Sequence, residues 1–261
     1  MRIAFPPYVT PIVLALVLGL AVWLSRLVAQ AARAADLPPA TRRRVTLSTA
    51  IVLGLWLIAA LLRAPAEVPV DANGRGIVPA AFAVFGTLSL VAAFGALALS
   101  DAWRRTVAAI PVERLVATQV FRLIGFIFLP LLALGALPAH FALPAGWGDV
   151  AVGLAAPLVA LALFRRAPGA RALAVGWNTF GLLDLMAAVG LGTGYLLQAL
   201  RPGVATEPAA AMTVFPLVLI PTFAVPLGII LHLYTFRALA RGRAAGTRGT
   251  ASLSPHSAPA R

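Results

Sequence analysis

VPAAFAVFGTLSLVAAFGALAL, residues 78–99, carries no charged side chain and is long enough to cross a bilayer as a helix. On either side of it, other apolar stretches of roughly 20 residues recur along the chain. They cover approximately residues 8–29, 45–62, 115–138, 147–164, 173–197 and 212–236. The sequence therefore predicts an all-α, polytopic membrane helix bundle of about seven transmembrane helices within residues 1–239.

The composition agrees with a membrane class and excludes several kinds of chemistry. Hydrophobic residues make up 61% of the chain and charged residues 11%, whereas about a quarter of a soluble domain is charged. All the basic residues are arginine, so no lysine imine can form, and the absence of cysteine excludes disulfides and thiolate chemistry. The net charge of +13 comes from arginines scattered between apolar stretches, which does not predict a nucleic-acid partner.

The distribution of arginine predicts the orientation of the bundle. Sixteen arginines fall in one set of loops and ends, and the opposite set holds only Arg2, Arg63, Arg75 and Arg201. Because positive residues are retained on the cytoplasmic side, we expect the N-terminus outside and the C-terminus in the cytoplasm. Residues 240–261, rich in glycine, alanine, serine, proline and arginine, are predicted to form a disordered basic cytoplasmic tail.

The same features indicate where the protein resides. An alanine-rich chain that uses arginine alone as its basic residue is typical of GC-rich bacteria, so we expect a multi-pass protein of the bacterial cytoplasmic (inner) membrane. A cleaved signal peptide ending near Ala29-Gln30-Ala31 is the alternative for the N-terminus. Arg26 interrupts the apolar stretch before that position, which favours a retained helix.

Polar side chains from three predicted helices fall at one depth in the cytoplasmic third. With about 1.5 Å of rise per residue, Arg122, Asn178 and His232 come out at similar depths, and Gln119 shares a helix face with Arg122. Ionisable groups at membrane depth are costly, so these four are candidates for solute binding or proton relay. Alternatively, Arg122 extends to the headgroups and His232 bonds a backbone carbonyl.

Asp184 is a further candidate, near the middle of the predicted sixth helix. Its short side chain cannot reach either interface, so it must be protonated, paired with Arg122 or a similar donor, or exposed to a watery cavity. A structural bond between helices is the alternative interpretation.

The segment from His140 to Asp149 is predicted to be a tight connection between the fourth and fifth helices, because it is rich in glycine and proline. His140 and Asp149 are therefore candidates on the outer side. Asp149 would lie in the first turn of the fifth helix, where its charge favours the helix dipole, and helix capping is the simpler explanation.

Three prolines interrupt the predicted seventh helix, Pro216, Pro221 and Pro226. Each removes one backbone hydrogen bond and leaves the carbonyl four residues earlier without its partner. Broken helices of this kind build transporter sites near the midplane, although a plain kink is the simpler reading.

Metal and cofactor chemistry is not predicted. His140 and His232 are expected near opposite sides of the membrane, and His256 is in the tail, so the sequence predicts neither a metal nor a haem site. The chain has no nucleotide loop or nucleophile motif, and the sequence does not predict an enzyme. Arg122, Asp184 and His232 leave lipid-modifying chemistry as a third-ranked alternative.

Two functional hypotheses follow. The first is a small-solute transporter or permease. In its proton-coupled form, Arg122 attracts an anionic solute, Asp184 relays a proton and His232 tunes the pKa of that relay. The second is a non-transporting sensor or accessory subunit whose polar residues only lock helices together. The predicted partners are the lipid bilayer and a small solute, and the sequence predicts neither a cofactor nor an oligomeric state.

Overall fold

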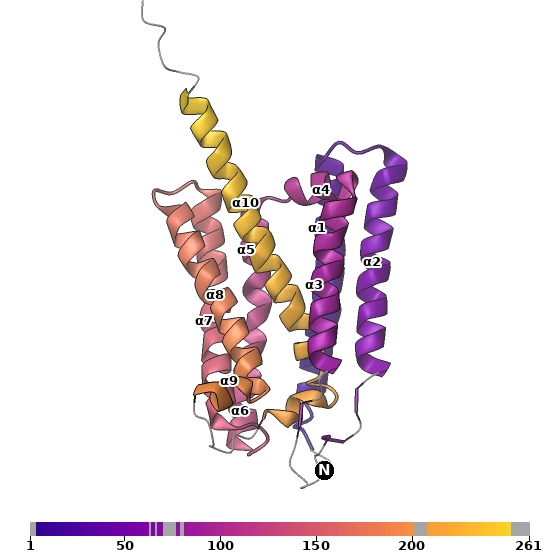
Figure 1. Cartoon of the computed structure of the whole chain (residues 1–261), viewed down its shortest axis with the longest axis vertical. Coiled ribbons are helices and arrows are strands. Elements are labelled where there is room, and N and C mark those ends of the chain that lie inside the picture. Colours follow the sequence, from indigo (N-terminus) through magenta and orange to yellow (C-terminus); the bar gives the residue numbers. More distant parts are fainter. Residues whose placement is uncertain are drawn as a thin grey trace, which may run out of the picture.

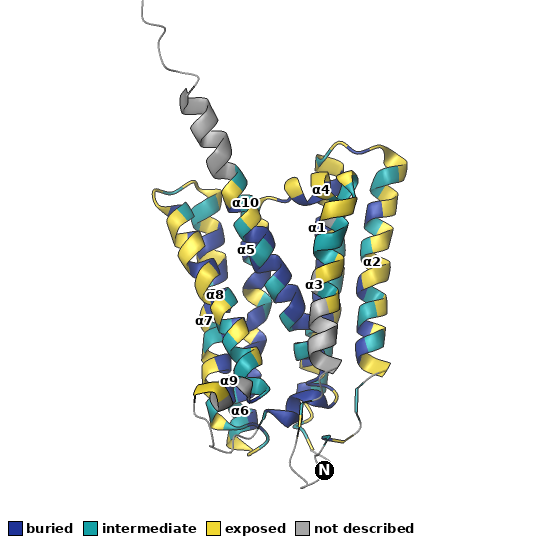
Figure 2. Cartoon of the chain, viewed as in Figure 1, coloured by how far each residue is buried: buried dark blue, intermediate teal, exposed yellow. Residues whose placement is uncertain are grey.

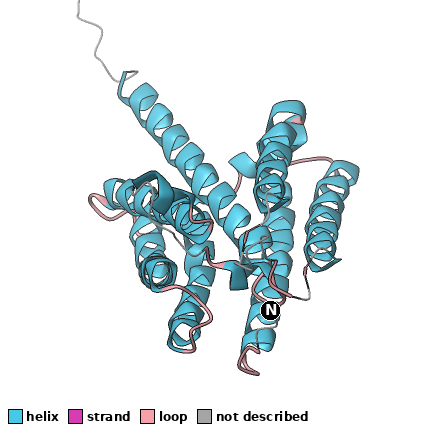
Figure 3. Ribbon diagram, turned by 60° about the horizontal axis from the view of Figure 1, so that its bottom comes forward, coloured by secondary structure: helices cyan, strands magenta, loops and turns pink. Residues whose placement is uncertain are grey.

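A computed structural model describes residues 4–62, 64–65, 67–69, 77–78, 81–200 and 208–251, and every regular element among them is helical (Figure 3). The long helices are α1 (Val9–Ala34), α2 (Pro39–Leu62), α3 (Ala81–Leu99), α7 (Ala139–Phe164), α8 (Ala170–Gly192) and α10 (Val225–Ala251). The shorter elements are α4 (Asp101–Ala108), α5 (Val112–Thr118), α6 (Phe128–Ala133) and α9 (Tyr195–Leu200), the 3₁₀ helices η1 (Gln119–Ile127) and η2 (Ala210–Thr213), and the π-helix η3 (Ile220–Ala224).

The helical membrane bundle is confirmed. Six helical segments among the described residues are long and apolar enough to span a bilayer. They are α1, α2, the continuous segment α5–η1–α6, α7, α8, and η3 with the first part of α10. The remaining predicted span corresponds to α3, where the side chains at residues 81–87, 90 and 97 lie outside those described. Among the described residues the structure supports six spans, and the prediction of a seventh depends on the sequence alone.

The helices form two groups joined by α10 (Figure 1). On one side α7 packs against η1 and α8, and on the other α1 packs against α2. Helix α10 contacts α5 and α8 in the first group and α3 in the second, so it crosses the centre of the bundle. Buried residues gather on α10, whereas the outer faces of α2, α7 and α8 are exposed (Figure 2). Those outer faces are apolar, as expected of surfaces that meet lipid.

The connections agree with the alternation that the arginine bias predicts. The α1–α2, α3–α4 and α7–α8 connections lie at the end of the bundle opposite the N-terminus, together with the far end of α10 (Figure 1). Helix α10 runs to Ala251, past residue 240 where the sequence predicts the tail to begin, and residues 252–261 lie outside those described.

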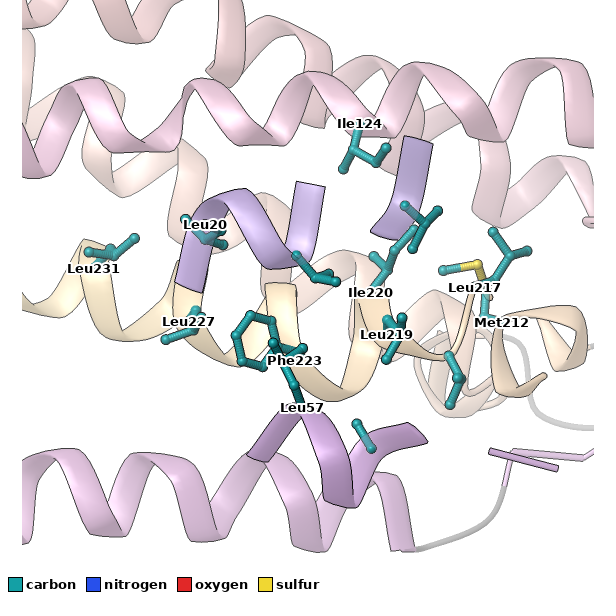
Figure 4. Close-up of a cluster of buried hydrophobic side chains, with 14 of the residues drawn as sticks. Leu20, Leu57, Ile124, Met212, Leu217, Leu219, Ile220, Phe223, Leu227 and Leu231 are labelled. Carbon is teal, nitrogen blue, oxygen red and sulfur yellow. The ribbon is translucent and has the colours of Figure 1, made fainter. Parts of the chain in front are cut away.

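The core is centred on the segment that leads into α10. Leu217, Leu219 and Phe223 are completely buried and point toward side chains from other helices (Figure 4). The ring of Phe223 meets that of Trp56 from α2 edge to face, with 5.2 Å between their centroids. This apolar packing holds the start of α10 against the N-terminal helices.

Two predicted boundaries are wrong. The segment from His140 to Asp149 is not a connection, because α7 begins at Ala139 and the turn lies at residues 134–138. Proline and glycine are tolerated inside membrane helices because neighbouring helices satisfy the freed backbone groups. The predicted seventh helix does not begin at residue 212, since the short helix η2 ends at Thr213, Val214 is extended and the π-helix starts at Ile220.

Candidate functional site

Arg122 is the centre of a buried polar cluster. It projects from η1, and only 1% of its surface is exposed. Its Nε donates to Asp149 Oδ1 at 2.6 Å, and its Nη2 forms an ion pair with Asp184. Its Nη1 donates to the backbone oxygen of Gly181 at 2.8 Å. One guanidinium therefore joins three segments of the bundle, η1, α7 and α8.

His232 and Asn178 complete the cluster from α10 and α8. The Nε2 atom of His232 lies 3.3 Å from Arg122 Nη1, and its Nδ1 lies 2.8 Å from Asn178 Oδ1. Asn178 Nδ2 in turn donates to the His232 backbone oxygen at 3.0 Å. These contacts require the His232 tautomer with its proton on Nδ1, because Nε2 must accept from the guanidinium. The cluster thereby links α10 to the other three segments.

Glycines allow the helices to approach closely enough for these bonds. A Cβ atom added at Gly148 would collide with the Asp184 carboxylate, and one at Gly125 would collide with Asp149. A Cβ at Gly181 would lie 2.5 Å from His232 Cε1 and 3.1 Å from Arg122 Nη1. Small residues at helix contacts are the usual means of close packing in membranes. The cluster depends on them directly.

A cavity of about 310 Å³ adjoins the cluster, bounded by α7, α8 and the segment that leads into α10. Asp149 is the one lining residue among those described that also belongs to the cluster. The other lining side chains are mainly apolar and include Phe128, Phe141, Pro221 and Pro226. Asp149 therefore faces Arg122 and the cavity at once.

The charges of the cluster do not balance by themselves. One guanidinium is paired with two carboxylates, so with His232 neutral the cluster carries one surplus negative charge. A buried net charge is costly in a medium of low dielectric constant. A proton on a carboxyl group or a cation close to Asp149 would compensate this surplus.

The structure brings together most of the residues singled out from the sequence. Arg122, Asn178, Asp184 and His232 meet within hydrogen-bonding distance. Asp149, expected on the outer side, lies in the third turn of α7 and joins them. The spacing of three and four residues between Gly146, Asp149 and Gly153 indicates that they share one helical face. The two glycines on that face allow another helix to approach Asp149 closely.

The other candidates remain separate from the cluster. Gln119 donates to the Gly228 backbone oxygen at 3.1 Å, and its Oε1 atom is buried without a partner among the described residues. His140 lies in the first turn of α7, and its Nε2 atom is likewise buried without a partner there. Neither side chain forms a hydrogen bond with Arg122 or Asp149 among the described residues.

The three prolines occupy different positions. Pro216 precedes the helix, whereas Pro221 lies in η3, Pro226 lies in the first turn of α10, and both line the cavity. The Thr222 carbonyl, left without its helical partner by Pro226, accepts a hydrogen bond from Trp56 Nε1 at 2.8 Å.

Within the described residues, no group of three histidine or acidic side chains is placed to hold a metal ion.

The fold and this cluster define a helical membrane protein of the multi-pass class. The chain belongs to the family described as "Domain of unknown function (DUF8737)", whose model matches residues 78–240. That match contains every residue of the cluster and leaves out α1 and α2. No curated protein and no solved structure matches the chain.

Proposed function

We propose that the protein exchanges a small, mainly hydrophobic organic cation for a proton across the membrane. The observation that carries this proposal is the position of Asp149, which pairs with Arg122 on one side and lines the cavity on the other. A charged residue shared between a buried ion network and a cavity links the occupancy of the cavity to the charge state of the network.

The charge balance favours a cation over the anionic solute expected from the sequence. The N–H groups of Arg122 are directed to Asp149, Asp184, Gly181 and His232, so the guanidinium is not free to receive an anion. The surplus negative charge is offset by a proton when the cavity is empty. A cation beside Asp149 offsets it equally well, and the proton is then released from the carboxyl group.

The lining of the cavity indicates the class of solute. Its volume of about 310 Å³ is at the lower limit of small-molecule pockets. Phe128 and Phe141, whose rings lie 5.5 Å apart, both line the cavity, and aromatic rings attract cations. An organic cation with a compact hydrophobic body, such as a benzylammonium, satisfies both the size and the apolar walls.

The irregular segments around the cavity are the proposed moving parts. The π-helix η3 and the prolines Pro221 and Pro226 form one wall, where helical hydrogen bonds are already interrupted. The segment that carries Arg122, η1, packs against α7 and is a 3₁₀ helix of nine residues, longer than most. Such segments change conformation at lower cost than a regular helix, as alternating access requires.

Reconstituted full-length protein tests the proposal. The probe is benzyltrimethylammonium, whose permanent charge ensures that any proton movement reported by pyranine trapped in the vesicles passes through the protein. We expect an outward gradient of the probe to drive protons inward, and Asp149→Asn to abolish both probe binding and proton movement. Asp36→Asn, at an exposed residue outside the cluster, serves as the matched control. Proton movement that persists in Asp149→Asn would overturn the proposal.

A second function is favoured by the completeness of the cluster. Arg122 is buried, and its partners surround it within the described residues, as expected of a network that only joins helices. In that case the protein is a non-transporting sensor or accessory subunit. This alternative predicts that Arg122→Leu lowers stability, while the wild-type protein binds no organic cation and moves no proton.

A further inference from the structure

A hollow of about 460 Å³ lies between the end of α1 and the start of α2, apart from the polar cluster. It is lined by Ala29, Arg33, Arg42, Arg43, Thr46 and Leu47. The hollow is at the arginine-rich end of the bundle, where the sequence predicts the cytoplasmic headgroup layer. It lies outside residues 78–240, so the family match does not include it.

The three arginines of the hollow have no ion-pair partner among the described residues. Within the part of the chain that is described, none of their side chains forms a salt bridge or a hydrogen bond. Their guanidinium groups are therefore free to donate to phosphate oxygens, which guanidinium binds in a bidentate manner. The adjacent turn is held in place, because Arg105 Nη2 donates to the Ala35 backbone oxygen at 2.8 Å and to that of Asp36 at 3.3 Å.

An apolar strip continues from the hollow toward the middle of the bundle along α2. Leu47, Ile51 and Leu55 follow Arg43 at four-residue spacing and share its helix face. They are 47%, 57% and 60% exposed, so among the described residues no other helix covers this face. A phospholipid has a charged headgroup at the membrane interface and acyl chains toward the membrane centre. The arginines of the hollow and the apolar strip are arranged in the same order.

We infer that this hollow binds the phosphate of an anionic phospholipid, with the acyl chain lying along Leu47, Ile51 and Leu55. Three arginines act together on one headgroup, which distinguishes an anionic lipid from a zwitterionic one. A free phosphate would use the arginines alone and gain nothing from the apolar strip. The inference does not rest on the proposed transport function, because it involves none of the same residues.

Native mass spectrometry of the full-length protein in a neutral detergent tests the inference. The probes are phosphatidylglycerol, phosphatidylcholine and glycerol phosphate, each titrated separately. The test variant replaces Arg33, Arg42 and Arg43 with Gln. The control replaces Arg44, Arg165 and Arg166 with Gln, which removes the same charge from exposed positions outside the hollow.

We expect one phosphatidylglycerol to bind the wild type more tightly than phosphatidylcholine. At about 1 kcal/mol for each arginine, the test variant should bind it on the order of 100-fold more weakly. The control should bind as the wild type does. Leu47→Gln retains the charges and should weaken phosphatidylglycerol binding by loss of the apolar contact. If the test and control variants lose phosphatidylglycerol binding equally, the lipid is held by general charge attraction. If glycerol phosphate binds the wild type as tightly as phosphatidylglycerol, the hollow binds a free anion. Either result would overturn the inference.

Discussion

Replacing Arg122 by Met removes the only positive charge that faces Asp149 and Asp184 among the described residues of the cluster. Methionine fills much of the same volume and is tolerated in apolar surroundings. The substitution therefore tests the charge and its hydrogen bonds more than the packing.

Two carboxyl groups, the Gly181 carbonyl and His232 Nε2 lose their donor when Arg122 is removed. Breaking a buried ion pair by deleting one partner costs about 3–5 kcal/mol. The two pairs do not add, because a carboxyl group left without a partner takes up a proton rather than remain charged. We expect the free energy of unfolding to fall by about 3–5 kcal/mol.

The carboxylates are expected to behave differently. Asp149→Asn removes the surplus negative charge and retains an oxygen that accepts from Arg122 Nε, so stability should change by no more than about 1 kcal/mol. Asp149→Asn combined with Asp184→Asn leaves the guanidinium unpaired, and the cost should return to about 3–5 kcal/mol.

Unfolding in mixed lipid and detergent micelles, followed by circular dichroism as dodecyl sulfate is added, measures these differences. Arg114→Met is the control, because Arg114 lies two turns earlier in the same span and is exposed. A cost below about 1 kcal/mol for Arg122→Met, or an equal cost for Asp149→Asn alone, would show that the guanidinium does not hold the cluster together.

Three further outcomes are expected from the same unfolding measurement. Gly148→Ala places a methyl group against the Asp184 carboxylate and should cost about 1–3 kcal/mol, whereas Gly176→Ala, with no atom within 4 Å of its added Cβ, should be neutral or mildly stabilising. Trp56→Phe leaves the Thr222 carbonyl without its donor and should cost about 1–3 kcal/mol, while Trp147→Phe at an exposed position should change stability little. His140→Leu removes a buried nitrogen without a partner and should be neutral or stabilising, and a loss above about 2 kcal/mol would indicate a bond to a group outside the described residues.

The relation between sequence and structure is clearest at Asp149 and Asp184. The mid-helix position of Asp184 requires compensation in lipid, and the structure supplies the predicted partner, Arg122. The sequence places Asp149 wrongly because Pro144, Gly146 and Gly148 resemble a turn in a soluble protein. In a membrane helix the same residues serve close packing, so local turn signals lose their usual meaning.

The sequence by itself determines the number of long apolar stretches, the uneven distribution of arginine and the polar residues inside the membrane. It does so because lipid imposes its constraints on each helix separately. Which polar residues meet, and the cavity beside Asp149, depend on how the helices rotate and approach one another. Those distances are set by side-chain packing between segments far apart in sequence, as between Gly148 and Asp184. Periodicity within one helix contains no information about them.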